Sequence, residues 1–134
     1  MGKKSRTRNV SKTEAKTYLD KGEQFIRTMR EALKNEDWDA VGLNAIHGVI
    51  SANDALLGTR HGVRPSSPDH GDAAVLLNQY EKSEDAKKNA NRLDRMMRKK
   101  NLVEYEGRKL TKSEATALAT DAERFFSWVK NTLI

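Results

Sequence analysis

Apolar positions recur at three- and four-residue steps along most of the chain, which is the spacing of an amphipathic helix. The first such stretch covers residues 15–33. Ser11 and Glu14, at its start, fit a capping box that satisfies the free N–H groups of a new helix. This pattern predicts a helix of about twenty residues, roughly 30 Å long.

A second helix is expected to begin near residues 35–37 and to run to Leu57. Its apolar residues fall on two stripes, so the helix is expected to be apolar over most of its circumference. Such a helix lies in the middle of a bundle or at a subunit interface. Small residues along it, Gly42 and Gly48 among them, allow neighbouring helices to approach closely.

Residues 58–71 form the one substantial break, which is rich in glycine and holds both prolines. A short helix is expected after it, over residues 72–80. No window of the chain shows the strict alternation of apolar and polar residues that marks a half-buried strand.

Two further helices complete the expected fold. Ser83 caps one that ends near Asn101, and a polar connection follows over residues 101–110. Thr111 and Glu114 form a second capping box, which opens the last helix. The pattern therefore predicts an all-α protein with four long or medium helices and one short one.

The chain has 134 residues, which suits a single domain. Residues 1–10 are basic and contain no acid, so a flexible basic N-terminal arm is expected before a helical domain at 11–134. The net charge is +6, which is compatible with an anionic partner. Cysteine is absent, which excludes disulfides, thiol catalysis and cysteine-ligated zinc.

The longest unbroken apolar run, residues 73–77, is far shorter than the roughly 18 residues that a membrane span needs. The N-terminus carries basic residues without the apolar segment of a secretory signal. The protein is therefore expected to be soluble and cytoplasmic, with no membrane partner.

Arg64 and His70 are the first candidates for chemistry because they lie in the glycine- and proline-rich break with five residues between them. A histidine can accept or donate a proton at the ribose 2′-hydroxyl or the 5′-oxygen. A guanidinium can hold the charge that develops on the phosphate oxygens. This pair suits metal-free cleavage of RNA, but it also fits a tight turn with a solvated arginine and a surface histidine.

A second candidate is the basic end of the fourth predicted helix. Its residues are Lys87, Lys88, Arg92, Arg95, Arg98, Lys99 and Lys100. Phosphate contacts along this face would give salt-sensitive binding of nucleic acid. The same run is typical of a solvated helix face, and basic residues near a helix C-terminus suit the helix dipole.

His47, in the apolar second helix, is either a buried proton carrier or a hydrogen-bonded core histidine. Asp54 needs a partner if it is buried, and Arg64 or Arg108 could supply one. The spacing of the remaining candidate metal ligands matches no zinc or di-iron pattern, so no metal or cofactor is expected. Those ligands are His61, Asp69, His70 and Asp72.

Several short motifs resemble the HEPN domain family. They are Ala45-Ile46-His47, Asn53-Asp54-Ala55-Leu56-Leu57, His61-Gly62-Val63-Arg64-Pro65, Asp69-His70-Gly71, the connection around Glu104-Tyr105-Glu106, and Ala122-Glu123-Arg124-Phe125. The likeness covers residues 15–133. It implies an up-and-down bundle of four to five helices that commonly dimerises.

The resemblance also implies a range of functions. Many HEPN domains are metal-independent ribonucleases, and they are often encoded beside a minimal nucleotidyltransferase in toxin–antitoxin or defence modules. Their signature is an arginine, a polar residue and then a histidine, and two such motifs face each other across the dimer. Here Lys100 stands at the arginine position, Asn101 at the polar position and Tyr105 at the histidine position. Lysine lacks the bidentate fork of arginine, and tyrosine is a poor base at neutral pH.

Two hypotheses follow. In the first, the protein binds RNA or a nucleotide-bearing partner and acts as a metal-independent endoribonuclease, with Arg64, His70 and Tyr105 as catalytic residues. The substrate-binding residues would be Lys100, Asn101, Arg60, His61 and Arg98. In the second, it is a non-catalytic dimeric module that partners a nucleotidyltransferase or another effector. The apolar second helix would then supply the dimer face, and Tyr105 would be a target for nucleotide transfer.

Overall fold

The computed structural model describes residues 7–66 and 72–134. These residues form six helices and two short strands. In chain order they are β1 (Thr7–Asn9), α1 (Lys12–Lys34), α2 (Trp38–His61), β2 (Val63–Pro65), α3 (Asp72–Tyr80), α4 (Glu84–Arg98), α5 (Lys100–Tyr105) and α6 (Lys112–Leu133). The predicted all-α bundle is confirmed, with one small antiparallel sheet added to it.

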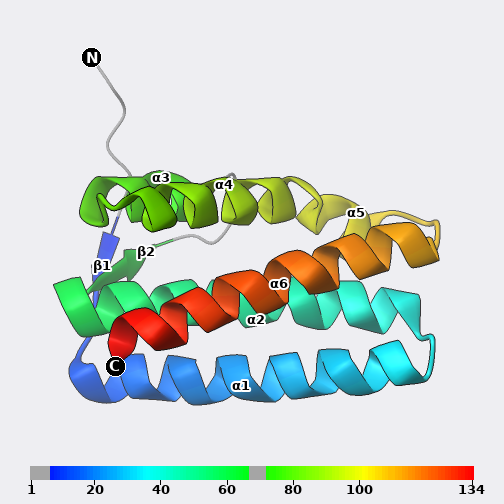
Figure 1. Ribbon diagram of the computed structural model, residues 1–134, viewed down its shortest axis with the longest axis horizontal. Helices are drawn as coiled ribbons and strands as arrows, with labels where there is room; N and C mark the ends of the chain where they lie inside the picture. The colour runs from blue at the N-terminus through cyan, green and yellow to red at the C-terminus, as the bar shows by residue number, and fades with distance from the viewer. Residues whose placement is uncertain (1–6, 67–71) are drawn as a thin grey trace.

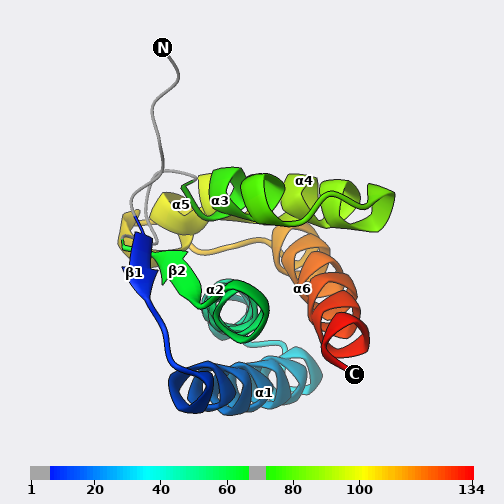
Figure 2. The same cartoon turned by 90° about the vertical axis from the view of Figure 1, so that its left-hand side faces the viewer.

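The four longest helices, α1, α2, α4 and α6, alternate in direction along the chain (Figure 1). Viewed end-on, α2 lies at the centre, with α1 below it, α6 to one side, and α3, α4 and α5 in a layer above (Figure 2). Fourteen residues of α2 are buried. Its apolar surface is thus used inside the bundle, and most of the dimer face expected on this helix is covered by its own chain.

Local capping sets where the long helices begin. The Ser11 and Thr111 side chains each accept a hydrogen bond from the backbone N–H of the glutamate three residues later, and both capping boxes are complete. Ser83 caps α4 in the same way, by accepting from the N–H of Ala86. The helix starts predicted from these three residues are therefore confirmed.

α2 runs four residues beyond its expected end at Leu57, to His61. Gly58 does not break the helix, because it lies in the closely packed interior, where an added Cβ would come within 2.7 Å of a Val10 side-chain carbon. The helix instead ends at Gly62, whose φ of 69° is left-handed and is favoured by glycine.

The expected flexible arm at residues 1–10 is wrong for its last four residues. Thr7, Arg8 and Asn9 pair in antiparallel register with Pro65, Arg64 and Val63. Val10 follows with only 7% of its surface exposed, and its N–H donates to the carbonyl of Gly62. A three-residue strand is too short to show alternation, and its partner is distant in sequence, so local pattern could not reveal it. Residues 1–6 lie outside the described residues.

The connection expected over residues 101–110 is also partly wrong, because α5 occupies its first half. The chain bends at Lys99, and the N–H of Val103 then donates to the Lys99 carbonyl. Leu102 and Val103 pack, half-buried, against the core. None of the helices within the described ranges is long and apolar enough to cross a membrane.

Candidate functional site

The C-terminal end of α2 carries a group of charged side chains, which we call the α2-end cluster: Asp54, Arg60, His61, Arg64 and Glu81. Glu81, just after α3, is only 8% exposed, and its Oε2 accepts from Arg60 Nε at 2.8 Å and pairs with His61 Nε2. Burial by itself raises the pKa of Glu81, but the hydrogen bonds and charges of Arg60 and His61 outweigh it and hold this pKa below the ordinary value. Glu81 is therefore an ionised carboxylate that ties α3 to α2.

The second acid of the α2-end cluster, Asp54, has a different environment. It is 8% exposed, and the nearest Arg64 nitrogen lies 3.8 Å from its Oδ2. Burial raises the pKa of Asp54 to about 7, and the charge of Arg64 offsets only part of this effect. Asp54 is therefore protonated in about half of the molecules near pH 7. Arg64 is then only partly neutralised, and its guanidinium also lies 5.5 Å from the centre of the Tyr18 ring.

Arg8 and Arg64 are directly opposite each other in the β1–β2 ladder. Directly opposite residues in an antiparallel pair project to the same face, and like charges in such a position repel. Arg8 is exposed and makes no ion pair within residues 7–66 and 72–134. Two neighbouring cations, of which only Arg64 has an acid beside it and that acid is weakly ionised, make a surface suited to an anion such as a phosphate.

A second group, the α5 cluster, consists of His47, Lys100, Glu104 and Tyr105. Glu104 is at its centre, with His47 Nε2 at 3.1 Å from its Oε1 and Lys100 Nζ at 2.9 Å from its Oε2. The Tyr105 hydroxyl also hydrogen-bonds to this carboxylate, and Lys100 Nζ lies 5.7 Å from the centre of the Tyr105 ring. Burial raises the pKa of Glu104, but these hydrogen bonds and the charges of Lys100 and His47 lower it more, so it is ionised at neutral pH.

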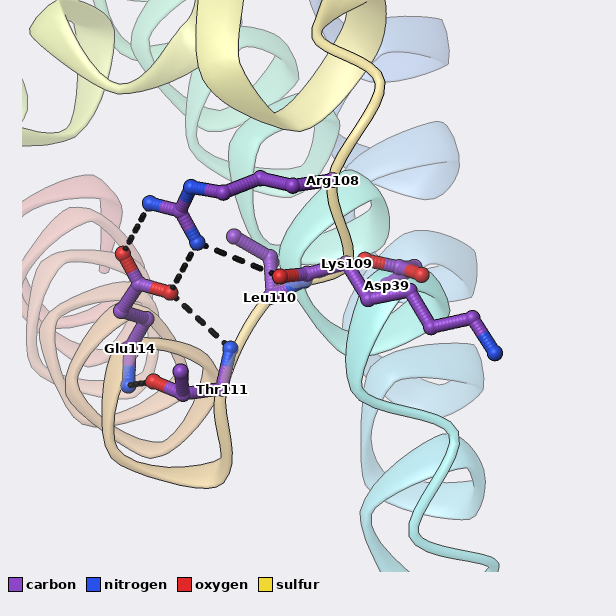
Figure 3. Close-up of polar contacts among 6 residues, drawn as sticks. All are labelled: Asp39, Arg108, Lys109, Leu110, Thr111 and Glu114. Carbon is purple, nitrogen blue, oxygen red and sulfur yellow. Dashed lines mark hydrogen bonds and ion pairs between the residues drawn. The ribbon is translucent and has the colours of Figure 1, made fainter.

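The connection after α5 fixes this helix against α2 (Figure 3). Arg108 makes a bidentate pair with Glu114, the residue that completes the capping box of α6. The N–H of Leu110 donates to the Asp39 carboxylate in the first turn of α2. Leu110 packs so closely on Gly42 that a Cβ there would come within 2.3 Å of its Cδ1. These contacts hold the connection that follows α5, the helix that carries Glu104.

The two clusters are separate. His47 and His61 are fourteen residues apart on α2, which is about 21 Å along a helix. The structure places Arg60, His61 and Arg64 in one cluster, and Lys100 and Tyr105 in the other. His70 and Asp69 lie outside the described residues, so the structure does not locate the expected Arg64–His70 pair relative to either cluster.

A model of the HEPN domain family matches residues 15–132. The chain belongs to the HEPN domain family. No curated protein and no solved structure matches the chain significantly. HEPN domains commonly dimerise, and many are ribonucleases or nucleotide-binding modules. The match covers nearly the whole chain, so both clusters belong to this HEPN domain.

The arginines of α4 in this HEPN domain form ion pairs with acidic side chains. Arg95 donates to Asp121 on α6 at 3.0 Å, and Arg98 donates to Asp94 one turn earlier on α4. Both arginines remain exposed at their heads, and Asn101 is exposed on α5. Within the described parts of the chain, no three histidine, cysteine or acidic side chains form a group that could hold a metal ion.

Sequence reasoning did not select Glu104, and it left the role of His47 open. His47 is neither buried nor part of the core, since 41% of its side chain is exposed. Its ring packs against Phe25 of α1, with 5.7 Å between ring centres. The available signal was a histidine on an otherwise apolar helix. Its partner could not be found from spacing, because Glu104 lies on a helix that the pattern did not predict. The pairing of Asp54 with Arg64, by contrast, is confirmed.

Proposed function

We propose that this HEPN domain binds RNA through its phosphates and cleaves it without a metal ion, as a homodimer within a cytoplasmic toxin–antitoxin or defence module. The observation that carries the proposal is the Arg8–Arg64 pair, two cations held opposite each other in the β1–β2 ladder. Their repulsion is relieved when an anion binds between them. Arg64 is one of the two residues that spacing selects for metal-free cleavage.

In this proposal Arg64 stabilises the charge that develops on the phosphate oxygens, and His70 transfers a proton. Tyr105 positions the substrate, with contacts from the residues predicted to bind it, which are Arg60, His61, Arg98, Lys100 and Asn101. The ribose 2′-oxygen attacks phosphorus and the bond to the 5′-oxygen breaks. The products carry a 2′,3′-cyclic phosphate and a 5′-hydroxyl, and no metal takes part.

The test is incubation of the purified protein with total RNA and with transfer RNA in EDTA, with the product ends analysed for cyclic phosphate. Cleavage that persists in chelator and is lost in the separate variants Arg64→Ala and His70→Ala supports the proposal. Arg124→Ala is the matched control, because Arg124 is exposed on α6 and has no ion pair within the described residues. Cleavage that is equal in all three variants contradicts the catalytic assignment.

Binding is measured separately from cleavage. Arg8→Ala is expected to weaken RNA binding about equally for all sequences and to reduce the slope of log affinity against log salt by about 1. If this slope is unchanged in Arg8→Ala, the assignment of a phosphate site to the β1–β2 ladder is contradicted.

The second candidate function is a non-catalytic dimeric module that partners a nucleotidyltransferase. The observation that favours it is Tyr105, which is 71% exposed at the end of α5 and is accessible to a modifying enzyme. Mass spectrometry after incubation with a nucleoside triphosphate and such a partner would show an added mononucleotide on wild type and none on Tyr105→Phe. A strict monomer at low micromolar concentration would contradict both dimeric versions.

A further inference from the structure

His47 has the geometry of a histidine oriented by a carboxylate. Its Nε2 lies 3.1 Å from Glu104 Oε1, which is the distance of an ion pair, and a proton on Nε2 leaves the free lone pair on Nδ1. Nδ1 has no hydrogen-bond partner among residues 7–66 and 72–134, and 41% of the side chain is exposed. The imidazole thus has a carboxylate beside one nitrogen and is open at the other.

Glu104 is well fixed for this orienting role. Only 13% of its side chain is exposed, and Lys100, which is equally buried, donates to the oxygen that His47 does not use. A buried carboxylate that is held in this way keeps an imidazole in one tautomer and stabilises the imidazolium that forms when the ring takes a proton. Phe25 packs on the ring from α1 and restricts its rotation further.

The surroundings of His47 suit a phosphodiester substrate. Tyr105, on the same short helix as Glu104, offers an exposed aromatic ring to a base, since base–aromatic stacking is tolerant of sequence. Lys100 adds a cation beside this ring, with its Nζ 5.7 Å from the ring centre.

We propose that His47, in place of His70, is the general base of the RNA cleavage put forward above, and that Glu104 is its positioning residue. The inference therefore rests on the proposed function and moves its proton transfer to the α5 cluster. Nδ1 of His47 takes the proton of the ribose 2′-hydroxyl as the bond between the 2′-oxygen and phosphorus forms. The bond from phosphorus to the 5′-oxygen breaks, and water protonates that oxygen. The hydroxide that remains takes the proton back from His47, so atoms and charge balance.

The experiment measures single-turnover cleavage of an RNA oligonucleotide in EDTA by wild type, His47→Ala, His47→Asn and Glu104→Gln. Both His47 variants are expected to lose about a hundredfold or more in rate, the range for removing a general base. Glu104→Gln loses less, because the imidazole remains. Asn44→Ala is the control, and its rate is expected to stay at the wild-type level. Asn44 is half-buried on the same helix, and among the described residues its side chain bonds only to the Ala40 carbonyl.

Added imidazole separates catalysis from structure. Free imidazole is expected to restore cleavage in His47→Ala, where the ring is missing. It is expected to restore nothing in Glu104→Gln, because that variant keeps the His47 ring in its place. A histidine that merely ties α2 to α5 shows no such rescue. Thermal melts of both His47 variants verify folding, and the asparagine variant keeps a polar group where alanine destabilises the fold.

The outcomes distinguish this inference from the function on which it rests. If both His47 variants cleave RNA as fast as wild type, the role of His47 is overturned and the proposed function stays intact. A rate loss without imidazole rescue in a folded His47→Ala also overturns it. Wild type that cleaves no RNA overturns both. An oligonucleotide with 2′-O-methyl groups, which has no 2′-proton to remove, is expected to stay intact.

Discussion

The α2-end cluster and the α5 cluster each place a histidine of α2 beside a largely buried glutamate from another segment, yet they differ in how much of each is open to solvent. In the α2-end cluster both acids are buried, and Glu81 bonds to an arginine and a histidine at once. In the α5 cluster only the carboxylate and the lysine are covered, while His47 and Tyr105 face solvent.

The difference shows that a histidine beside a carboxylate has two uses. His61 is covered by the Tyr80 ring and shares its acid with Arg60, so its pairing mainly joins α2 to α3. His47 has its acid at one nitrogen and solvent at the other. Access to the second nitrogen, rather than the presence of the pair, separates a structural contact from a site that can exchange a proton.

Replacing Asp54 by asparagine is expected to give the largest change in stability. The pKa of Asp54 is about 7 in the folded protein and 3.8 ordinarily, so the folded state keeps a proton that the unfolded chain releases between these values. The free energy of unfolding therefore falls as pH rises through this window. Asp54→Asn removes this loss, which amounts to as much as about 4 kcal/mol above pH 8 and to little near pH 4.

Urea denaturation of wild type and Asp54→Asn at a series of pH values measures this. The exposed Asp20→Asn is the control, and its stability is expected to follow wild type at every pH. A difference between Asp54→Asn and wild type that stays constant with pH would show that Asp54 is ionised throughout and that Arg64 fully compensates its burial.

Replacing Glu81 by glutamine tests the structural use of a buried carboxylate. The change leaves Arg60 and His61 with a neutral acceptor, and we expect a loss of about 1–2 kcal/mol, since hydrogen bonds to charged groups are the stronger ones and Arg60 is half-exposed. Because the pKa of Glu81 is lowered in the folded protein, its contribution is present above the ordinary pKa and is lost in acid.

The loss at Glu81 is therefore expected at pH 7 and should shrink as the pH falls below about 4.5, where the wild-type carboxyl also loses its charge. Glu31→Gln is the comparison, because the Glu31–Lys34 pair is exposed and 3.7 Å apart, and such pairs contribute little. If the two substitutions lower the free energy of unfolding equally, the buried carboxylate of Glu81 contributes no more to stability than a surface carboxylate.

Replacing Tyr105 by phenylalanine is expected to change stability least, by under about 0.5 kcal/mol, because the residue is exposed and its ring is kept. The lost hydroxyl contacts Glu104, so the rate of RNA cleavage should fall although the thermal midpoint does not move. A fall in both, in proportion, would place Tyr105 among the residues that only hold α5 in position.

Local sequence determined the parts of this fold that depend on neighbouring residues. The capping boxes at Ser11 and Thr111 could be identified because their partners are three residues away. The central position of α2 was one of two options that its apolar circumference left open. The pairing of Asp54 with Arg64 was one of two options as well, because charge and burial limited the partners without choosing between them.

Only the tertiary structure decided which distant segments meet. β1 forms because residues 7–9 lie beside residues 63–65 once α1 and α2 have packed, and a three-residue strand has no periodicity of its own. α5 is short and has no side-chain cap, so its stability comes from packing on α2 rather than from a local signal. The His47–Glu104 pair depends on that packing. The sequence by itself determined the helical bundle and its HEPN character, and the packing of segments far apart in the chain decided which histidine has an acid beside it and an open nitrogen.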